Sequence, residues 1–305
     1  MGAVPLFGLH SGRRRAIIKG NKKKQRPEEG LNEHESRIAP LVLQAGRMIL
    51  DARDVEMTGR VTEKAEDAAN LVTAYDKAVQ DYLVSALTAL YPDACFLAEE
   101  QENDAAVLTA PRCFVIDPID GTANFIHGLC HSSVSLAMLE SGKIVFGAVY
   151  DPYLDELYTA TLGGGAYLNG RRISVSGRTP RHAMTVFGTS PYQKERFGNA
   201  TFRLAEALCR KTRDVRRSGS AALDLAAVAA GRADIFFELA LSPWDMAAGL
   251  LLIREAGGTV TGLDGAHLEL GGDAAGVLAA NPACYGFLLT EARAVLDDNA
   301  KGELL

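Results

Sequence analysis

Residues 117–125 read DPIDGTANF, directly after the short apolar run 113–116, which predicts a buried strand. Because Pro118 restricts the backbone after that strand, the carboxylates of Asp117 and Asp120 can converge on one point beyond the strand end. Carboxylate oxygens are hard ligands that favour Mg2+, with Mn2+ as a possible substitute. The alternative is that Asp-Pro and Asp-Gly only form turns, since a lone Asp-x-x-Asp pair is weak support for a metal site.

The two residues that follow add features suited to phosphate. Gly121 has no side chain, so a backbone or ligand can approach it closely. Thr122 offers a hydroxyl and a backbone N–H at the predicted start of a helix, where phosphate groups bind readily. A metal site and a phosphate site would therefore adjoin.

The charge of the 305-residue chain is divided unevenly. The net charge is −6, and residues 1–26 carry eight Lys/Arg and no acid, so residues 27–305 carry −14. An acidic body argues against nonspecific binding to nucleic acid or to an anionic membrane. No apolar run approaches the roughly 20 residues of a membrane helix. The five cysteines are odd in number and widely spaced, which disfavours a disulfide scaffold or zinc site and fits the reducing cytoplasm.

Hydrophobic periodicity predicts two long helices, at 33–52 and 74–90, followed by buried strands at 94–98 and 113–116. A mostly antiparallel meander comes next, with strands at 131–139, 143–150, 156–160, 166–168 and 173–176. The second half alternates, with strands at 184–188, 213–217, 233–239, 259–261 and 276–280 and helices at 199–210, 221–230, 244–256 and 283–296.

We predict from this pattern a disordered basic tail at 1–30 and a single domain at 31–305. The domain divides into an α+β half (31–180) that holds the metal motif and an α/β half (181–305) that supplies Asp245 and Glu238. Sheets would be sandwiched between layers of helices.

Three acids outside the central motif have competing interpretations. Asp245 follows Ser242 and Pro243, so it can be the third residue of a capping box or a metal ligand. Asp76 has the same spacing from Thr73. Glu238 interrupts an apolar strand, where a charge is costly unless it has a partner.

Four ordered motifs together resemble the inositol monophosphatase family, a branch of the lithium-sensitive, metal-dependent phosphatases. They are NLVTAYD at 70–76, LAEE at 97–100, DPIDGTANF at 117–125 and WDMAAGLLLIREAGG at 244–258, and the resemblance extends over about residues 35–295. It implies a layered α-β-α-β-α sandwich of the inositol monophosphatase and fructose-1,6-bisphosphatase type. Glu100 is interpreted as a solvated acid rather than a ligand.

The resemblance also implies a role for individual residues. The metal ligands would be Glu99, Asp117, the Ile119 carbonyl, Asp120 and Asp245, together holding two or three Mg2+. Glu99, Thr122 and Asp76 would be catalytic, with Thr122 hydrogen-bonded to Asp76 and helping to orient or deprotonate the attacking water. The substrate would contact Gly121, Thr122, Gly219, Ser220, Ala221, Glu238 and Asp245.

The implied activity is Mg2+-dependent hydrolysis of a small phosphorylated metabolite by a metal-activated water, with myo-inositol monophosphate as the first substrate. Histidinol phosphate, fructose bisphosphate and phosphoadenosine phosphate stay open, since the sequence departs from the family pattern at Gln80 and at 130–132. Family members are commonly homodimers and inhibited by lithium. A different class of function, an RNA- or transcription-associated binding protein, is suggested by some bacterial relatives and the basic tail.

Overall fold

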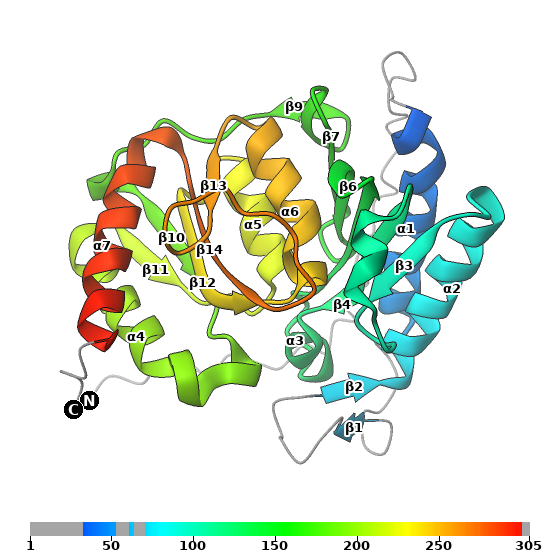
Figure 1. Ribbon diagram of the computed structural model, residues 1–305, viewed down its shortest axis with the longest axis horizontal. Helices are drawn as coiled ribbons and strands as arrows, with labels where there is room; N and C mark the ends of the chain where they lie inside the picture. The colour runs from blue at the N-terminus through cyan, green and yellow to red at the C-terminus, as the bar shows by residue number, and fades with distance from the viewer. Residues whose placement is uncertain (1–32, 53–60, 64–70, 301–305) are drawn as a thin grey trace, which may run out of the picture.

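The computed structural model describes residues 33–52, 61–63 and 71–300 (Figure 1), so the predicted tail lies outside the described residues. Helices and sheets alternate in five layers. One sheet lies between the pair α1–α2 and the pair α5–α6, and the second sheet lies between α5–α6 and the pair α4–α7. The predicted layered α-β-α-β-α sandwich is confirmed. Among the described residues, no helix combines the length and apolar character of a membrane span.

The first sheet has seven strands in sequence order. Only the first pair, β3 and β4, is parallel, and every later pair is antiparallel. The turn between β5 and β6 is tight because Ser141 and Gly142 both have positive φ (49° and 83°), which matches the twist of a two-residue hairpin. The strands are β3 Cys95–Ala98, β4 Cys113–Asp120, β5 Ser133–Glu140, β6 Lys143–Asp151, β7 Glu156–Thr161, β8 Gly165–Leu168 and β9 Arg171–Ile173.

The second sheet has five strands in the order β11-β10-β12-β14-β13. Strand β10 is parallel to both of its neighbours, and β14 is antiparallel to both of its own. Helices connect β10, β11, β12 and β13, which run in one direction, whereas β14 follows β13 without an intervening helix and runs in the opposite direction. The strands are β10 Met184–Phe187, β11 Asp214–Arg216, β12 Ile235–Leu241, β13 Thr259–Thr261 and β14 Ala275–Ala280.

The helices match the predicted positions closely, and the one between β10 and β11 begins five residues earlier than expected. They are α1 Glu33–Asp51, α2 Ala74–Leu90, α3 Thr122–Ile126, α4 Lys194–Lys211, α5 Ala221–Ala229, α6 Pro243–Glu255 and α7 Pro282–Ala300. Two short antiparallel strands, β1 Val61–Glu63 and β2 Leu71–Thr73, were not predicted, because three-residue strands carry too little periodicity.

Helix α6 is the element that connects the two sheets. A Cβ atom at Gly147 of β6 would lie 3.0 Å from the carbonyl oxygen of Ala248, so the glycine lets the helix pack directly on the first sheet. On its other side, a Cβ at Gly249 would come within 2.5 Å of Leu225 in α5. This close packing brings the N-terminus of α6 to the end of β4.

Two strand ends differ from the prediction by more than two residues. Strand β4 continues to Asp120 instead of ending at Ile116, with an irregular register between Asp117 and Asp120. The strand expected at 173–176 is instead β9, which ends at Ile173. The chain leaves the sheet there because the Val175 N–H donates to the carbonyl of Ala256 at 3.0 Å.

Candidate active site

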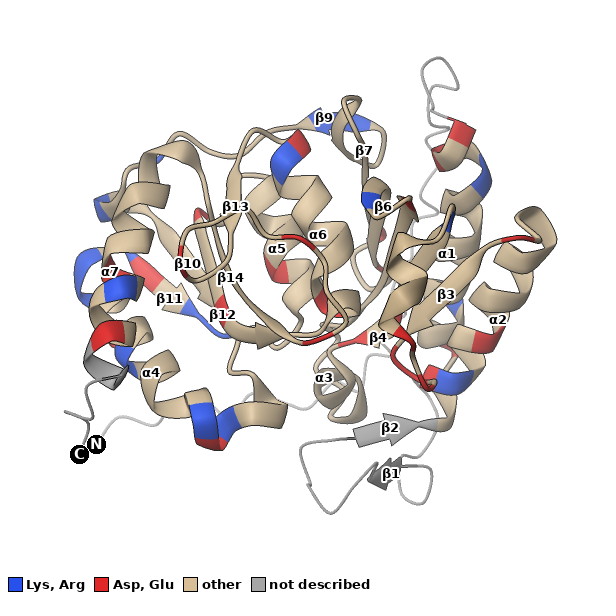
Figure 2. Cartoon of the chain, viewed as in Figure 1, with Lys and Arg blue, Asp and Glu red and all other residues tan. Residues whose placement is uncertain are grey.

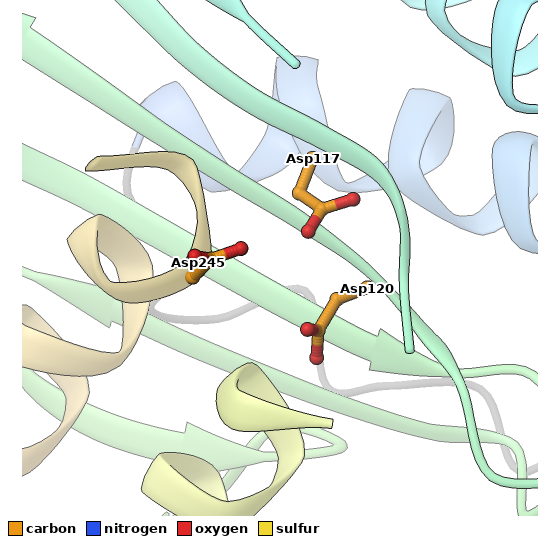
Figure 3. A group of neighbouring side chains, drawn as sticks. All are labelled: Asp117, Asp120 and Asp245. Carbon is orange, nitrogen blue, oxygen red and sulfur yellow. The ribbon is translucent and has the colours of Figure 1, made fainter. Parts of the chain in front are cut away.

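The end of strand β4 carries two carboxylates that point to the same side of the sheet edge (Figure 3). The side chain of Asp117 is 1% exposed, and its carboxylate accepts the backbone N–H of Ile119 at 3.0 Å. Pro118 has no N–H to pair with the neighbouring strand, and the register with β5 shifts between Asp117 and Asp120. The irregularity turns the second carboxylate toward the first.

The third carboxylate, Asp245, comes from the first turn of α6 (Figure 3). The backbone N–H of Ser242 donates to it at 2.8 Å, so the capping interpretation is confirmed. One carboxylate oxygen of each of Asp117, Asp120 and Asp245 lies within 4.8 Å of the others. Capping uses one face of the carboxylate and leaves acceptor capacity on the other. The two interpretations of Asp245 are therefore compatible.

The electrostatics of this cluster are those of crowded like charges. Burial raises the pKa of Asp117 well above its ordinary value, and the charges of Glu99 and Asp120 raise it further. Burial, followed by the charges of Glu99 and Asp120, likewise raises the pKa of Asp245 well above its usual range. Cations placed among these oxygens would relieve the repulsion and restore the charged forms.

Asp120 is held by the start of helix α5. The hydroxyl of Ser220 donates to its carboxylate, and the backbone N–H groups of Ala221 and Ala222 donate at 3.3 and 3.0 Å. Gly219 has a φ of +94°, and this left-handed backbone aims the helix start at the carboxylate. The predicted substrate-contacting residues 219–221 thus lie at the cluster, with two of them bound to Asp120.

The predicted catalytic hydroxyl also has partners in the site. The Thr122 hydroxyl is 3.3 Å from a carboxylate oxygen of Asp76 and 3.1 Å from the carbonyl oxygen of Ile119. Asp76 is fully buried in the first turn of α2. The side chain of Thr73 lies outside the described residues, so the predicted capping box between Thr73 and Asp76 stays a prediction. Gly121 has φ +87°, and a Cβ there would lie 3.0 Å from the Gly219 carbonyl.

Glu99 and Glu238 line the same cavity of about 390 Å³ as the three aspartates. Glu99 is not among the three mutually close carboxylates, but its charge raises the pKa of two of them. Glu238 is 4% exposed, accepts the N–H of Ser190 at 2.6 Å, and has its pKa raised to about 7, chiefly by burial. The structure therefore brings every predicted site residue except Asp76 to the wall of one cavity, and Asp76 reaches it through Thr122.

The cavity residues that the sequence analysis missed include Tyr192, Arg217 and Asp224. Asp224 had a usable signal, because a lone acid in the apolar helix α5 must find a partner, and burial raises its pKa well above the ordinary value. Tyr192 and Arg217 lie in loops without periodicity and had none. At a position where the family usually has an acid, the Gln80 side chain accepts the N–H of Glu100 at 2.8 Å.

The donor set fits divalent metal. Carboxylate and carbonyl oxygens, without nitrogen or sulfur donors, are the ligands that Mg2+ and Mn2+ prefer. Asp117, Asp120 and Asp245 would hold the ions directly, and Glu99 and the Ile119 carbonyl stand beside them as further oxygens. All five cysteines are unpaired, and none lines the cavity among the described residues.

Comparisons with known proteins agree with the geometry. Residues 33–297 match the model of the inositol monophosphatase family. The chain is 40% identical over 251 residues to Nus factor SuhB of Pseudomonas aeruginosa, covering 81% of this chain and 90% of that protein. It is 40% identical over 249 residues to inositol-1-monophosphatase of Mesorhizobium japonicum, covering 81% and 91%.

A solved structure, extragenic suppressor protein suhB from Bartonella henselae, aligns with a TM-score of 0.79 at 33% identity and covers 86% of this chain and 99% of that one. The two sequence relatives each cover 81% of this chain, and the solved structure covers 86%. The chain belongs to the inositol monophosphatase family.

Proposed function

We propose that this protein hydrolyses a small phosphate monoester in a Mg2+-dependent reaction, with myo-inositol monophosphate as the substrate. The observation that carries the proposal is the convergence of Asp117, Asp120 and Asp245, whose carboxylate oxygens lie within 4.8 Å of one another on the wall of a cavity. The relative from Mesorhizobium japonicum is named inositol-1-monophosphatase, which supports this choice of substrate.

The carboxylates would hold the metal ions, which supply positive charge to the phosphoryl oxygens and lower the pKa of water. The chain's own residues provide the positioning. Glu99 would orient the attacking water from the end of β3, and Thr122 would accept a hydrogen bond from that water while its own hydroxyl donates to Asp76. Water attacks phosphorus as the bond to the alcohol oxygen breaks, which yields inorganic phosphate and the free alcohol.

The other end of the cavity would bind the alcohol. Glu238 is buried and presents a carboxylate that can accept a substrate hydroxyl. Gly121 and the helix start at residues 219–221 offer small side chains that leave room for the phosphate and the ring. Six site acids in one cavity would repel a phosphate without cations, so the metal requirement follows from the charge.

The proposal is tested by phosphate release from inositol 1-phosphate, with EDTA-treated protein and with added Mg2+ or Mn2+. We expect turnover only with a divalent ion, and inhibition by millimolar lithium. The same assay with histidinol phosphate, fructose 1,6-bisphosphate and phosphoadenosine phosphate compares the alternative substrates. Absence of phosphate release from every substrate in the presence of Mg2+ would contradict the proposal.

A second candidate function comes from the relative named Nus factor SuhB, together with the basic residues 1–26. We propose that any binding to RNA depends on this segment, because the rest of the chain carries −14. Salt-sensitive RNA binding that is lost on removal of residues 1–26 would support this role. Loss of phosphatase activity on the same truncation would instead assign the segment to the enzyme.

We also propose a homodimer in the cytoplasm, as is common for the family. Sedimentation analysis of the full-length chain measures its mass directly. A mass of about 33 kDa at micromolar concentration, the mass of one 32.6 kDa chain, would contradict the dimer.

A further inference from the structure

The cavity contains one strongly basic side chain among many acids. Of the residues that line it in the described part of the chain, Arg217 alone is a lysine or an arginine. It directly follows β11, and Figure 2 shows Lys and Arg on α4 and at the end of β11. The proposed hydrolysis assigns no task to this guanidinium.

Local contacts hold Arg217 beside the proposed alcohol-binding end of the cavity. Its Nη2 donates to the hydroxyl of Thr189, another residue that lines the cavity, at 3.3 Å. A Cβ at Gly219 would lie 2.8 Å from its Nη1, so the guanidinium packs against the backbone that leads into α5. The buried side chain of Asn124 fixes this backbone by donating to the carbonyl of Ser218 at 2.9 Å.

Within the part of the chain that the structure describes, the charge of Arg217 is not used in a salt bridge. In the described residues no carboxylate lies within 4.0 Å of its guanidinium, whereas the adjacent Arg216 pairs with Asp214 at 2.5 Å. Arg217 is near enough to Asp224 and Glu238 to lower the pKa of both, against the larger upward effect of burial. Once cations neutralise the aspartate cluster, the guanidinium is the main exposed charge at this end of the cavity.

We propose that Arg217 binds a second anionic group, a phosphate or a carboxylate, carried by the alcohol portion of the substrate. This inference rests on the proposed phosphatase function. A guanidinium presents paired N–H donors that match both kinds of oxyanion, and it stays charged at every physiological pH. Phosphate monoesters that carry a second anionic group then gain a contact at Arg217 that myo-inositol monophosphate, with its neutral alcohol, does not make.

The competing explanation is that Arg217 only balances the charges of Asp224 and Glu238. Pairs of substrates that differ in a single group separate the two explanations. Fructose 1,6-bisphosphate and fructose 1-phosphate differ by a phosphate, and 2-phosphoglycerate and glycerol 2-phosphate differ by a carboxylate. For each pair we measure kcat/KM for the ester that carries the second anionic group and divide it by kcat/KM for the ester that lacks it.

We expect Arg217→Gln to lower this ratio about tenfold, a modest effect because the side chain is exposed. Arg217→Lys should recover part of it by keeping the charge. The matched control is Arg216→Gln, which removes a neighbouring arginine that does not line the cavity and should leave the ratio unchanged. Thermal unfolding of each variant checks that the fold is retained.

An equal fall in kcat/KM for both members of each pair would overturn the inference, since charge balancing affects all substrates alike. The inference would also fail if the wild-type protein prefers the esters without a second anionic group and Arg217→Gln does not change that preference. The phosphatase proposal would still stand in that case. A lower ratio in only one pair identifies the second group as phosphate or as carboxylate. If the wild-type protein cleaves none of the four esters or inositol 1-phosphate, it is the proposed function that fails.

Discussion

Asp234 and two aspartates of the candidate active site, Asp117 and Asp245, have opposite surroundings. Asp234 is fully buried and accepts hydrogen bonds from Arg178 Nε at 3.0 Å to each oxygen and from the Met184 N–H at 2.7 Å. Ser176 and Asn281 donate to it as well. Every lone pair in this group has a donor, and a guanidinium balances the charge.

In the active-site cluster the arrangement is reversed. Asp117 has one backbone donor, Asp245 has one, and both face Glu99 and Asp120 instead of a basic group. A buried charge without a counter-charge is costly, and a fold keeps one only where something else supplies the compensation. The contrast separates a carboxylate that completes the structure from carboxylates that are available to a ligand.

The largest expected effect is on catalysis. Asp245→Asn should abolish Mg2+-dependent phosphate release, a loss of at least about 1000-fold, because it removes a charged ligand. The amide oxygen can still accept the Ser242 N–H, and one repulsive charge is gone, so stability in EDTA should be equal or higher. Phosphate release and thermal unfolding, measured on the same samples, check both parts. Asp120→Asn should abolish phosphate release as well, and near-normal turnover in either variant would contradict the ligand assignment.

Asp234→Asn should give the opposite result. It leaves Arg178 without its counter-charge, and we expect a loss of about 3 kcal/mol in the free energy of unfolding, reduced somewhat because Arg178 is partly exposed. Urea denaturation measures this loss. The matched control is Asp214→Asn, which breaks the exposed pair with Arg216 and should leave the urea midpoint unchanged. A similar midpoint for both variants would show that the partners of Asp234 contribute little.

The same contrast explains what the sequence could predict. The strand followed by DPIDGT places two acids together through local geometry alone, and a capping box places Asp245 at a helix start, so these positions were predictable from short-range rules. That both meet at one point depends on the packing of α6 against β6 through Gly147, a long-range contact that only the family resemblance anticipated.

Other features had no local signal. Asp234 sits in a loop between α5 and β12, and its donors come from residues 176, 178, 184 and 281, which are far apart in the sequence. Nothing in the sequence distinguishes Arg217 from the other arginines, and only the structure shows that it lines the cavity. Periodicity describes burial along one element, so it misses polar groups that are assembled from several loops.

The surroundings of Glu238 are intermediate between those of Asp234 and those of Asp117 and Asp245. We therefore expect the smallest effect from a substitution of Glu238. It has a good donor in the Ser190 N–H, yet its pKa is about 7 in the folded chain, against 4.5 ordinarily. Between these values the unfolded chain has lost the proton and the folded chain retains it, so stability must fall as pH rises through this window and level off above about 7. The full shift corresponds to about 3 kcal/mol.

Glu238→Gln removes this titration, so its free energy of unfolding in EDTA should decline less than that of the wild type between pH 5 and pH 8, by about 1–3 kcal/mol. Urea denaturation at the two pH values measures the difference. Asp117, Asp224 and Asp245 have raised pKa values too, and they are present in both proteins. The charge of Glu238 helps to raise the pKa of Asp224 and Asp245, so its removal lowers their pH dependence as well, which acts in the same direction. An equal decline in the two proteins would mean that Glu238 is already charged at pH 5, and would place it with Asp234 among the fully compensated carboxylates.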